Sequence, residues 1–264
     1  MPAKAGPPAT ISVAIPLYNK RREIARTIQS VFDQTFQQFE ILVIDDGSTD
    51  GGADIVAQIG DPRVRLIRQA NAGVSAARNH AISEAKTELI AFLDADDEWK
   101  PGFLAAIWDL RERFPEAGLY ATAYERHLPN GGVAQLTLSQ VPPAPWSGII
   151  DNYYRAAFDD ALIWSSAVAV PKQVFAEVGG FPVGIRLGED LDMWLRIALR
   201  YPIAYRNTSL AIYDQAASNR AMQQNHCNDN LVMAQTAADA LAQGLVTADQ
   251  EDDLREYVYM YQIL

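Results

Sequence analysis

The sequence predicts an α/β fold built on a mixed, mostly parallel β-sheet flanked by helices, and two observations lead to this prediction. Short apolar segments alternate with helical segments through the first part of the chain. Polar side chains follow the ends of several of these segments, where open α/β sheets place their ligands. With 264 residues, 49% of them hydrophobic, the chain is long enough to bury a substantial core.

Four strands joined by helices are expected in the N-terminal part of the chain. Short runs rich in apolar residues predict the strands, and longer segments between them predict the helices. Such an order gives parallel strands with helical crossovers. The expected strands are 11–17, 39–44, 64–67 and 88–93; the first helix ends near Phe32 and the next two span 50–59 and 74–85.

The pattern changes after Pro101 and predicts a mixed second half. A helix is expected to about Phe114, followed by strand-like stretches at 118–124 and 133–138 that a turn at 129–132 connects. Residues 141–145 are rich in proline and predict a loop over or beside a site, and two polar helices are expected from about Ser218 to the end.

The composition limits the classes of function. The formal charge of -11, from 33 acidic and 22 basic residues, argues against sequence-independent nucleic-acid binding and against adsorption to anionic membranes. Cys227 has no partner for a disulfide, residues 1–10 lack the apolar core of a signal peptide, and no apolar run reaches the length of a membrane span. We therefore expect a cytoplasmic protein, with peripheral attachment at the inner face of a membrane left open.

Three carboxylates follow the apolar strand that ends at Leu93, and they are the most informative feature of the chain. Asp94, Asp96 and Asp97 need a partner for their charge, and at a strand end of an α/β sheet the natural partner is a divalent cation that carries a phosphate. Neither a Gly-x-x-x-x-Gly-Lys-Ser/Thr loop nor a Gly-x-Gly-x-x-Gly motif follows the first strand. A P-loop NTPase or a dinucleotide dehydrogenase is therefore not expected.

Five segments, taken together and in order, resemble the inverting glycosyltransferases of family 2. The resemblance covers about residues 11–206 and implies a Rossmann-like GT-A fold in one domain. It implies a donor-binding half at 11–100 and an acceptor-binding and catalytic half at 101–217, and the composition adds a disordered tail at 1–10 and C-terminal helices at 218–264. The segments are Pro16-Leu17-Tyr18-Asn19, Asp45-Asp46-Gly47-Ser48-Thr49-Asp50, Asn71-Ala72-Gly73-Val74-Ser75-Ala76-Ala77-Arg78-Asn79, Asp94-Ala95-Asp96-Asp97 and Gly188-Glu189-Asp190-Leu191-Asp192-Met193-Trp194-Leu195-Arg196.

The first two segments predict a pocket for the nucleotide base. A carboxylate at Asp46 could accept a hydrogen bond from an imide N–H, which uracil and thymine offer and cytosine lacks, so a uridine or thymidine carrier is favoured. A turn or capping role is the alternative for Asp46, and capping is favoured for Asp50. The resemblance places Tyr18 against the base and Pro16 under it, and Asn19 completes this part of the donor site.

The next two segments predict contacts to the diphosphate and a metal. Gly73 opens a helix where backbone can approach a ligand, and Arg78 could reach the nucleotide or its phosphates, a surface ion pair being the alternative. The resemblance assigns Asp94 to the ribose and metal region and Asp96 to coordination of Mn²⁺ or Mg²⁺. Ala95 belongs to the same nucleotide-binding segment, although its side chain is expected to face away.

The last segment predicts the catalytic base. Inversion in one step needs a base that takes the proton of the acceptor hydroxyl, and Asp190 is the candidate, with Glu189 as the neighbour that orients it or touches the acceptor. Both would open a helix, where N-terminal charge is the alternative explanation. Asp192 and Arg196 at i,i+4 are expected to pair.

One departure from the family pattern concerns a histidine that helps to bind metal or diphosphate. The corresponding segment, 212–220, contains none, and Asp214, Gln215 or Arg220 are the candidates to replace it. For the acceptor, Trp146 and Trp164 are the aromatic side chains favoured as a platform for a sugar ring.

The sequence thus predicts a metal-dependent inverting glycosyltransferase that moves a sugar from a nucleoside diphosphate carrier, with UDP favoured, to a saccharide or glycolipid hydroxyl. The resemblance implies a role in surface polysaccharide synthesis. A sugar-1-phosphate nucleotidyltransferase and a catalytically impaired nucleotide-sugar binding protein are the alternatives. The apolar C-terminus is expected to pack against the domain or against a partner in a homodimer, or to continue in a missing segment.

Overall fold

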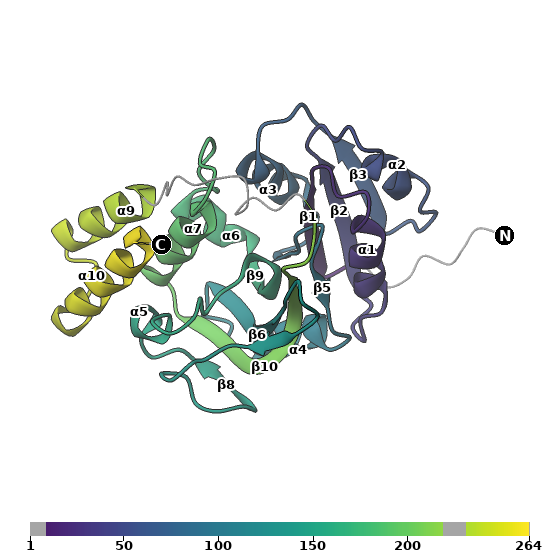
Figure 1. Ribbon diagram of the computed structural model, residues 1–264. Helices are drawn as coiled ribbons and strands as arrows, with labels where there is room; N and C mark the ends of the chain where they lie inside the picture. The colour runs from purple at the N-terminus through teal and green to yellow at the C-terminus, as the bar shows by residue number, and fades with distance from the viewer. Residues whose placement is uncertain (1–8, 219–230, 264) are drawn as a thin grey trace.

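A ten-stranded sheet forms the centre of the computed structural model, which describes residues 9–218 and 231–263. The order along the sheet is β3-β2-β1-β4-β9-β6-β10-β5, with β7 beside β6 and β8 beside β10. Strands β3, β2, β1, β4, β6 and β10 run in one direction and β9 runs in the other. The sheet is therefore mixed and mostly parallel, and helices lie on both of its sides (Figure 1).

The N-terminal part confirms the predicted alternation of strands and helices. Strands β1 and β2 are parallel neighbours that pair from Ile11↔Phe39 to Leu17↔Asp45. Both are buried along almost their whole length, as expected for strands covered on both faces. The elements are β1 (Ile11–Leu17), α1 (Ile24–Phe32), β2 (Phe39–Asp45), α2 (Gly52–Ala57), β3 (Val64–Arg68), α3 (Val74–Glu84) and β4 (Leu89–Phe92).

The second half contains an antiparallel strand that the sequence did not predict. Strand β9 lies between β4 and β6, and its four residues are too few to show an alternating pattern. The elements here are β5 (Glu98–Trp99), α4 (Phe103–Arg113), β6 (Leu119–His127), β7 (Val133–Gln135), β8 (Trp146–Ile149), α5 (Tyr153–Ala156), a 3₁₀ turn (Ser165–Ala167), β9 (Val168–Pro171), α6 (Lys172–Val178), α7 (Glu189–Ala198) and β10 (Ile203–Asp214).

Two C-terminal helices, α9 (Leu231–Ala242) and α10 (Ala248–Ile263), pack beside α7 and α5 (Figure 1). Thr236 donates a 2.6 Å hydrogen bond to Asp192 of α7, and the hydroxyl of the fully buried Tyr257 lies 3.0 Å from that of Tyr153. The expectation that the apolar C-terminus packs against the domain is thus confirmed for α10. No helix among the described residues combines the length and apolar character that a membrane crossing needs.

Candidate active site

The predicted strand-end segments meet at one edge of the sheet. β1, β2 and β4 are parallel neighbours, and Leu93 continues the pairing by donating its N–H to Ala14 O. The residues that follow each strand therefore lie side by side, as the sequence predicted. Asn19, after β1, has a positive φ of 53° and accepts a 2.8 Å hydrogen bond from Thr49 N, which joins the first two segments directly.

Asp46 holds the loop that leads into α3. Its buried carboxylate accepts hydrogen bonds from Gln69 Nε2 at 2.7 Å, Ala72 N at 2.9 Å and Gly73 N at 2.8 Å. Three of the about four positions at which a carboxylate can accept are thus used within the chain, and about one has no partner among the described residues. In this structure Asp46 has the turn-stabilising role that the sequence left as the alternative.

The other residues predicted for the base pocket differ in exposure. Tyr18, which follows β1 directly, is 45% exposed, while Pro16 lies half-buried in β1. Gly73 has a φ of 90°, and a Cβ at this position would meet open space. Asp50 accepts the N–H of Gly52, the first residue of α2, at 2.8 Å, whereas the N-cap position is Gly51 and has no side-chain cap hydrogen bond.

The two alternating carboxylates after β4 each have a cationic partner in the chain. Asp94 Oδ1 accepts a 2.9 Å hydrogen bond from Arg78, and Asp96 Oδ2 accepts a 2.6 Å hydrogen bond from Lys20 Nζ. Both side chains keep some exposure, 24% and 16%, whereas Ala95 is buried and faces away, as expected. Burial raises the pKa of Asp96, although the Lys20 ammonium opposes the shift.

Lys20 is a site residue that the sequence analysis did not single out. It follows Asn19 at the end of β1, and its side chain spans the edge of the sheet to reach Asp96 and the carbonyl of Ser218 at 2.5 Å. Its position directly after a strand-end motif was the available signal, because any long cation there could reach a carboxylate at the end of the neighbouring strand.

Asp97 is fixed behind the other two carboxylates. Its buried side chain accepts hydrogen bonds from Trp164 Nε1 at 2.8 Å, Ser166 Oγ at 2.5 Å and Asp214 N at 3.0 Å. Burial, together with the negative charges of Asp96 and Asp94, raises its pKa well above the usual range. Asp97 thus supports the site from within.

This arrangement also determines the environment of Trp164. Its indole stacks on Tyr213, with ring centroids 4.0 Å apart, in addition to its hydrogen bond with Asp97. Trp146, the second aromatic residue favoured as an acceptor platform, lies on β8 in a separate pocket near α4.

Arg78 links Asp94, in the predicted donor site, to Glu189 in the predicted catalytic segment. Its guanidinium is 3% exposed and donates to Asp94 Oδ1 and to Glu189 Oε1, both at 2.9 Å. The two carboxylates raise its pKa, although burial opposes the shift. A surface ion pair does not describe this geometry, because Asp94 and Glu189 bind the guanidinium together inside the site.

Asp190 and Glu189 open α7 in different environments. Glu189 is buried, and burial together with the charge of Asp190 raises its pKa to about 7, which outweighs the opposing effect of Arg78. Asp190 is half-buried and accepts a 2.9 Å hydrogen bond from Ser165 Oγ, a residue that no sequence pattern marked. The predicted pair on this helix is confirmed, because Arg196 donates to Asp192 at 2.8 Å.

The segment that lacks a histidine reaches the site through Asp214. Asp214 N bonds to Asp97, and its carboxylate pairs with Arg26. Gln215 donates its N–H to His127 O at 2.8 Å. Arg220 lies outside the described residues.

The described residues contain no group of three or more histidine, cysteine or acidic side chains suited to hold a metal. A divalent cation in this site would therefore be bound by the two carboxylates of Asp94 and Asp96. Each of the two carboxylates has one oxygen engaged by a cationic side chain of the protein, and both carboxylates are partly exposed. Mg²⁺ is often bound through one or two carboxylates, with substrate phosphates and water completing its shell, so these residues fit such an ion.

Comparison with known proteins identifies similar sequences and folds. Residues 12–159 match the family described as Glycosyl transferase family 2. The putative teichuronic acid biosynthesis glycosyltransferase TuaG of Bacillus subtilis is 32% identical over 208 residues, which cover 77% of this chain and 78% of that protein. Escherichia coli YibD, a glycosyltransferase, is 45% identical over 93 residues, 34% of this chain and 27% of that protein. A Nostoc glycosyltransferase is matched over 31% of its length, so the chain aligns with less than a third of these two relatives.

A solved structure confirms the fold class. Residues 1–349 of S. aureus TarS, crystallised with UDP-GlcNAc, superpose with a TM-score of 0.75 at 18% identity, covering 96% of this chain and 71% of that one. The predicted GT-A architecture is therefore correct.

Proposed function

Because the chain belongs to glycosyltransferase family 2, we propose that it transfers a sugar from UDP to a hydroxyl group of a saccharide or glycolipid acceptor, with inversion at the anomeric carbon. The observation that carries the proposal is the buried bridge from Asp94 through Arg78 to Glu189. It joins Asp94, which follows β4 in the predicted donor site, to α7, the helix that carries the candidate base Asp190. Donor binding and proton transfer would therefore take place in one site.

The donor would lie over the edge formed by β1, β2 and β4. Asp46 keeps one acceptor position for the base and orders the loop at Gly73, while Tyr18 offers an exposed ring directly after β1. Asp96 and Asp94 would hold Mn²⁺ or Mg²⁺, which neutralises the charge that develops on the leaving diphosphate. Lys20 lies at the same place and can add its positive charge to the β-phosphate once Asp96 turns to the ion.

Asp190 would take the proton of the acceptor hydroxyl. Ser165 orients its carboxylate by donating to Oδ2, and Asp190 lies in the first turn of α7. The raised pKa of Glu189, about 7, gives this neighbour a partly protonated population near neutral pH. A neutral Glu189 would reduce the repulsion that Asp190 experiences as a carboxylate.

The acceptor and the carrier are inferred from the relatives. TuaG is named for teichuronic acid biosynthesis and TarS was crystallised with UDP-GlcNAc and with UDP, which supports a UDP-sugar and a role in surface polysaccharide synthesis. Family membership argues against the alternative of a sugar-1-phosphate nucleotidyltransferase.

Asp190→Asn tests the proposal. UDP release from a panel of UDP-sugars, with water as the acceptor, should fall by about 10²-fold or more, the usual contribution of a general base. UDP affinity should not change, because the proposed role of Asp190 involves the acceptor hydroxyl and not UDP. Asp239→Asn, on the exposed face of α9, is the matched control and should keep full activity. Unchanged UDP release in Asp190→Asn would remove Asp190 as the base.

A protein that binds nucleotide sugars without turnover is the second candidate. Lys20 engages Asp96, and the segment 212–220 lacks the expected histidine. Tight UDP binding by the parent protein without UDP release from any sugar in the panel would favour this candidate over the transferase.

A further inference from the structure

Lys20 and Asp96 form an ion pair within the proposed metal site. The ammonium lies 2.6 Å from Asp96 Oδ2, and the two side chains are only 11% and 16% exposed. Lys20 also donates to the carbonyl oxygen of Ser218 at 2.5 Å. A cation of the protein therefore lies on a carboxylate that a divalent cation would use, and both cations draw on the same negative charge.

Helix α1 fixes this pair in place. Thr27 Oγ1 donates to the carbonyl oxygens on both sides of Asp96, at 3.0 and 2.9 Å, and Arg26 donates to the carbonyl oxygen of Asp96 itself at 3.1 Å. Lys20 belongs to the same helical segment, because its carbonyl oxygen accepts from Ile24 N at 2.9 Å. The lysine and the backbone that carries the carboxylate are thus anchored to one helix, so a rotation of either side chain is enough to separate ammonium and carboxylate.

Ser218 gives the ammonium an acceptor that carries no charge. The N–H and the hydroxyl of Ser218 donate to Glu23 Oε1, at 3.0 and 2.7 Å, and Glu23 is a buried residue one turn after Lys20. Glu23 therefore holds Ser218 beside Lys20. When Asp96 turns to an ion, Lys20 keeps this acceptor, and the donor that Asp96 releases is available to a phosphate oxygen.

The cation that pairs with Asp94 is held more firmly. Arg78 donates to Asp94 and to Glu189, both at 2.9 Å, and is 3% exposed. Moving Arg78 away from Asp94 would leave a buried charge with one carboxylate fewer, which is costly inside a protein. Lys20, which is more exposed, is therefore the cation that moves when the site takes up a metal and a donor.

We propose that Lys20 is an internal counterion that competes with the divalent cation for Asp96 and is released from it by the diphosphate of the donor. The second part rests on the proposed function. Without UDP, the ammonium neutralises part of the charge that attracts the ion, so the metal binds weakly. With UDP, the phosphates draw Lys20 away from Asp96 and the metal binds more tightly; by linkage, the metal strengthens UDP binding by the same factor.

Binding of Mn²⁺, followed by the electron paramagnetic resonance signal of the free ion, tests the competition without turnover. Without UDP, Lys20→Met should tighten Mn²⁺ binding about tenfold, as expected for the loss of one competing charge-assisted contact. With saturating UDP the gain should stay below about twofold, because the parent protein has already released Asp96. Lys20→Gln, which keeps a donor for Ser218, should behave like Lys20→Met, and Lys20→Arg, which keeps the charge, should behave like the parent.

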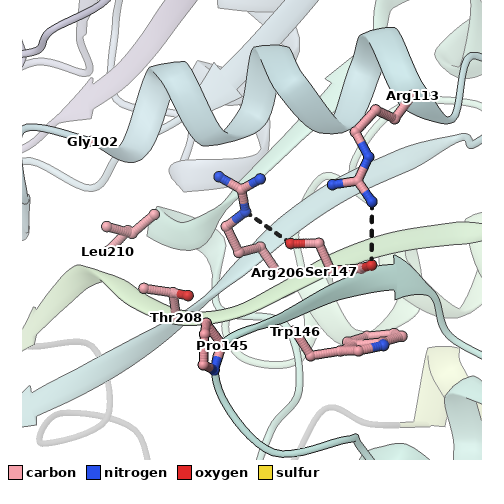
Figure 2. Close-up of a pocket in the computed structure, with 8 residues that line it drawn as sticks. All are labelled: Gly102, Arg113, Pro145, Trp146, Ser147, Arg206, Thr208 and Leu210. Carbon is pink, nitrogen blue, oxygen red and sulfur yellow. Dashed lines mark hydrogen bonds between the residues drawn. The ribbon is translucent and has the colours of Figure 1, made fainter.

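Two controls locate the effect at Asp96. Adding Asp96→Asn to Lys20→Met should abolish the gain, because the carboxylate for which the cations compete is gone. Arg206, one of the residues that line the pocket in Figure 2, is 25% exposed and pairs with Asp109. Arg206→Met thus removes a paired cation elsewhere and should leave the Mn²⁺ affinity unchanged. Circular dichroism checks that each variant is folded.

Three results would overturn the proposal: equal Mn²⁺ affinity of the parent and Lys20→Met without UDP, a gain of the same size with and without UDP, or a gain that survives Asp96→Asn. Failure of the proposed function gives a different result. The parent would then bind no UDP, while Lys20→Met would still gain Mn²⁺ affinity through Asp96; the competition would stand and the release by a diphosphate would fall.

Discussion

Replacing Arg78 with methionine should lower the free energy of unfolding by about 3–5 kcal/mol at pH 8, the usual cost of breaking a buried ion pair on one side. Arg78 is 3% exposed and holds two carboxylates at 2.9 Å. At an effective dielectric constant near 20 each pair is worth about 4 kcal/mol before desolvation is subtracted. Methionine has a similar length and no charge, so the main change is the loss of the cation between Asp94 and Glu189.

The pH dependence of this loss separates the two carboxylates. Glu189 has a pKa raised to about 7 and would be raised further without Arg78, so at pH 5.5 it is neutral in the variant. The destabilisation should then fall to roughly half of its value at pH 8, because the pair with Asp94 accounts for the remainder. Adding Glu189→Gln to the variant should recover about 1–2 kcal/mol at pH 8.

Urea unfolding followed by circular dichroism measures these differences, and Arg255→Met is the control. Arg255 is 60% exposed and lies 3.8 Å from Glu251, so its loss should cost less than about 0.5 kcal/mol. A loss below about 1 kcal/mol for Arg78→Met at pH 8, or an equal loss at both pH values, would refute the bridge as the element that holds the two segments together.

Three further predictions concern single residues. The raised pKa of Glu189 means that the folded state binds its proton more tightly than the unfolded state does. The contribution of Glu189 to stability should therefore fall by up to about 3 kcal/mol as pH rises from 4.5 to 7. Glu189→Gln should flatten this part of the plot of unfolding free energy, measured with urea, against pH. Gly118→Ala should cost about 1–3 kcal/mol in thermal unfolding, because a Cβ there would overlap the Tyr201 side chain; no loss would show that the ring moves freely. Tyr257→Phe should cost about 1–2 kcal/mol, because it leaves the buried Tyr153 hydroxyl without its partner, and unchanged resistance of α10 to proteolysis would contradict this.

The sequence predicted the parallel part of the fold because its signals are local. The strands from β1 to β4 are short and rich in apolar residues, and the helices α1, α2 and α3 connect them, so their order predicts parallel strands with helical crossovers. Strand β9 was missed because an antiparallel insertion of four residues depends on contacts with β4 and β6, which are distant in sequence.

In the candidate site, likewise, some neighbours follow from local sequence signals and others depend on contacts between distant parts of the chain. Strand ends identified Asp46, Asp94 and Asp96 as neighbours, because parallel strands bring their carboxyl ends to one edge. The partners of these side chains could not be read from the pattern. The pairing of Lys20 with Asp96, and of Arg78 with both Asp94 and Glu189, depends on where long side chains reach across the fold.

Calorimetric titration of UDP, with and without Mn²⁺, on the parent protein and on Asp96→Asn tests the assignment of the donor site. If the edge formed by β1, β2 and β4 is the donor site, the parent should bind UDP more tightly with Mn²⁺ and the variant should lose this gain. Absence of UDP binding under every metal condition, or an equal gain from Mn²⁺ in Asp96→Asn, would contradict the assignment of this site.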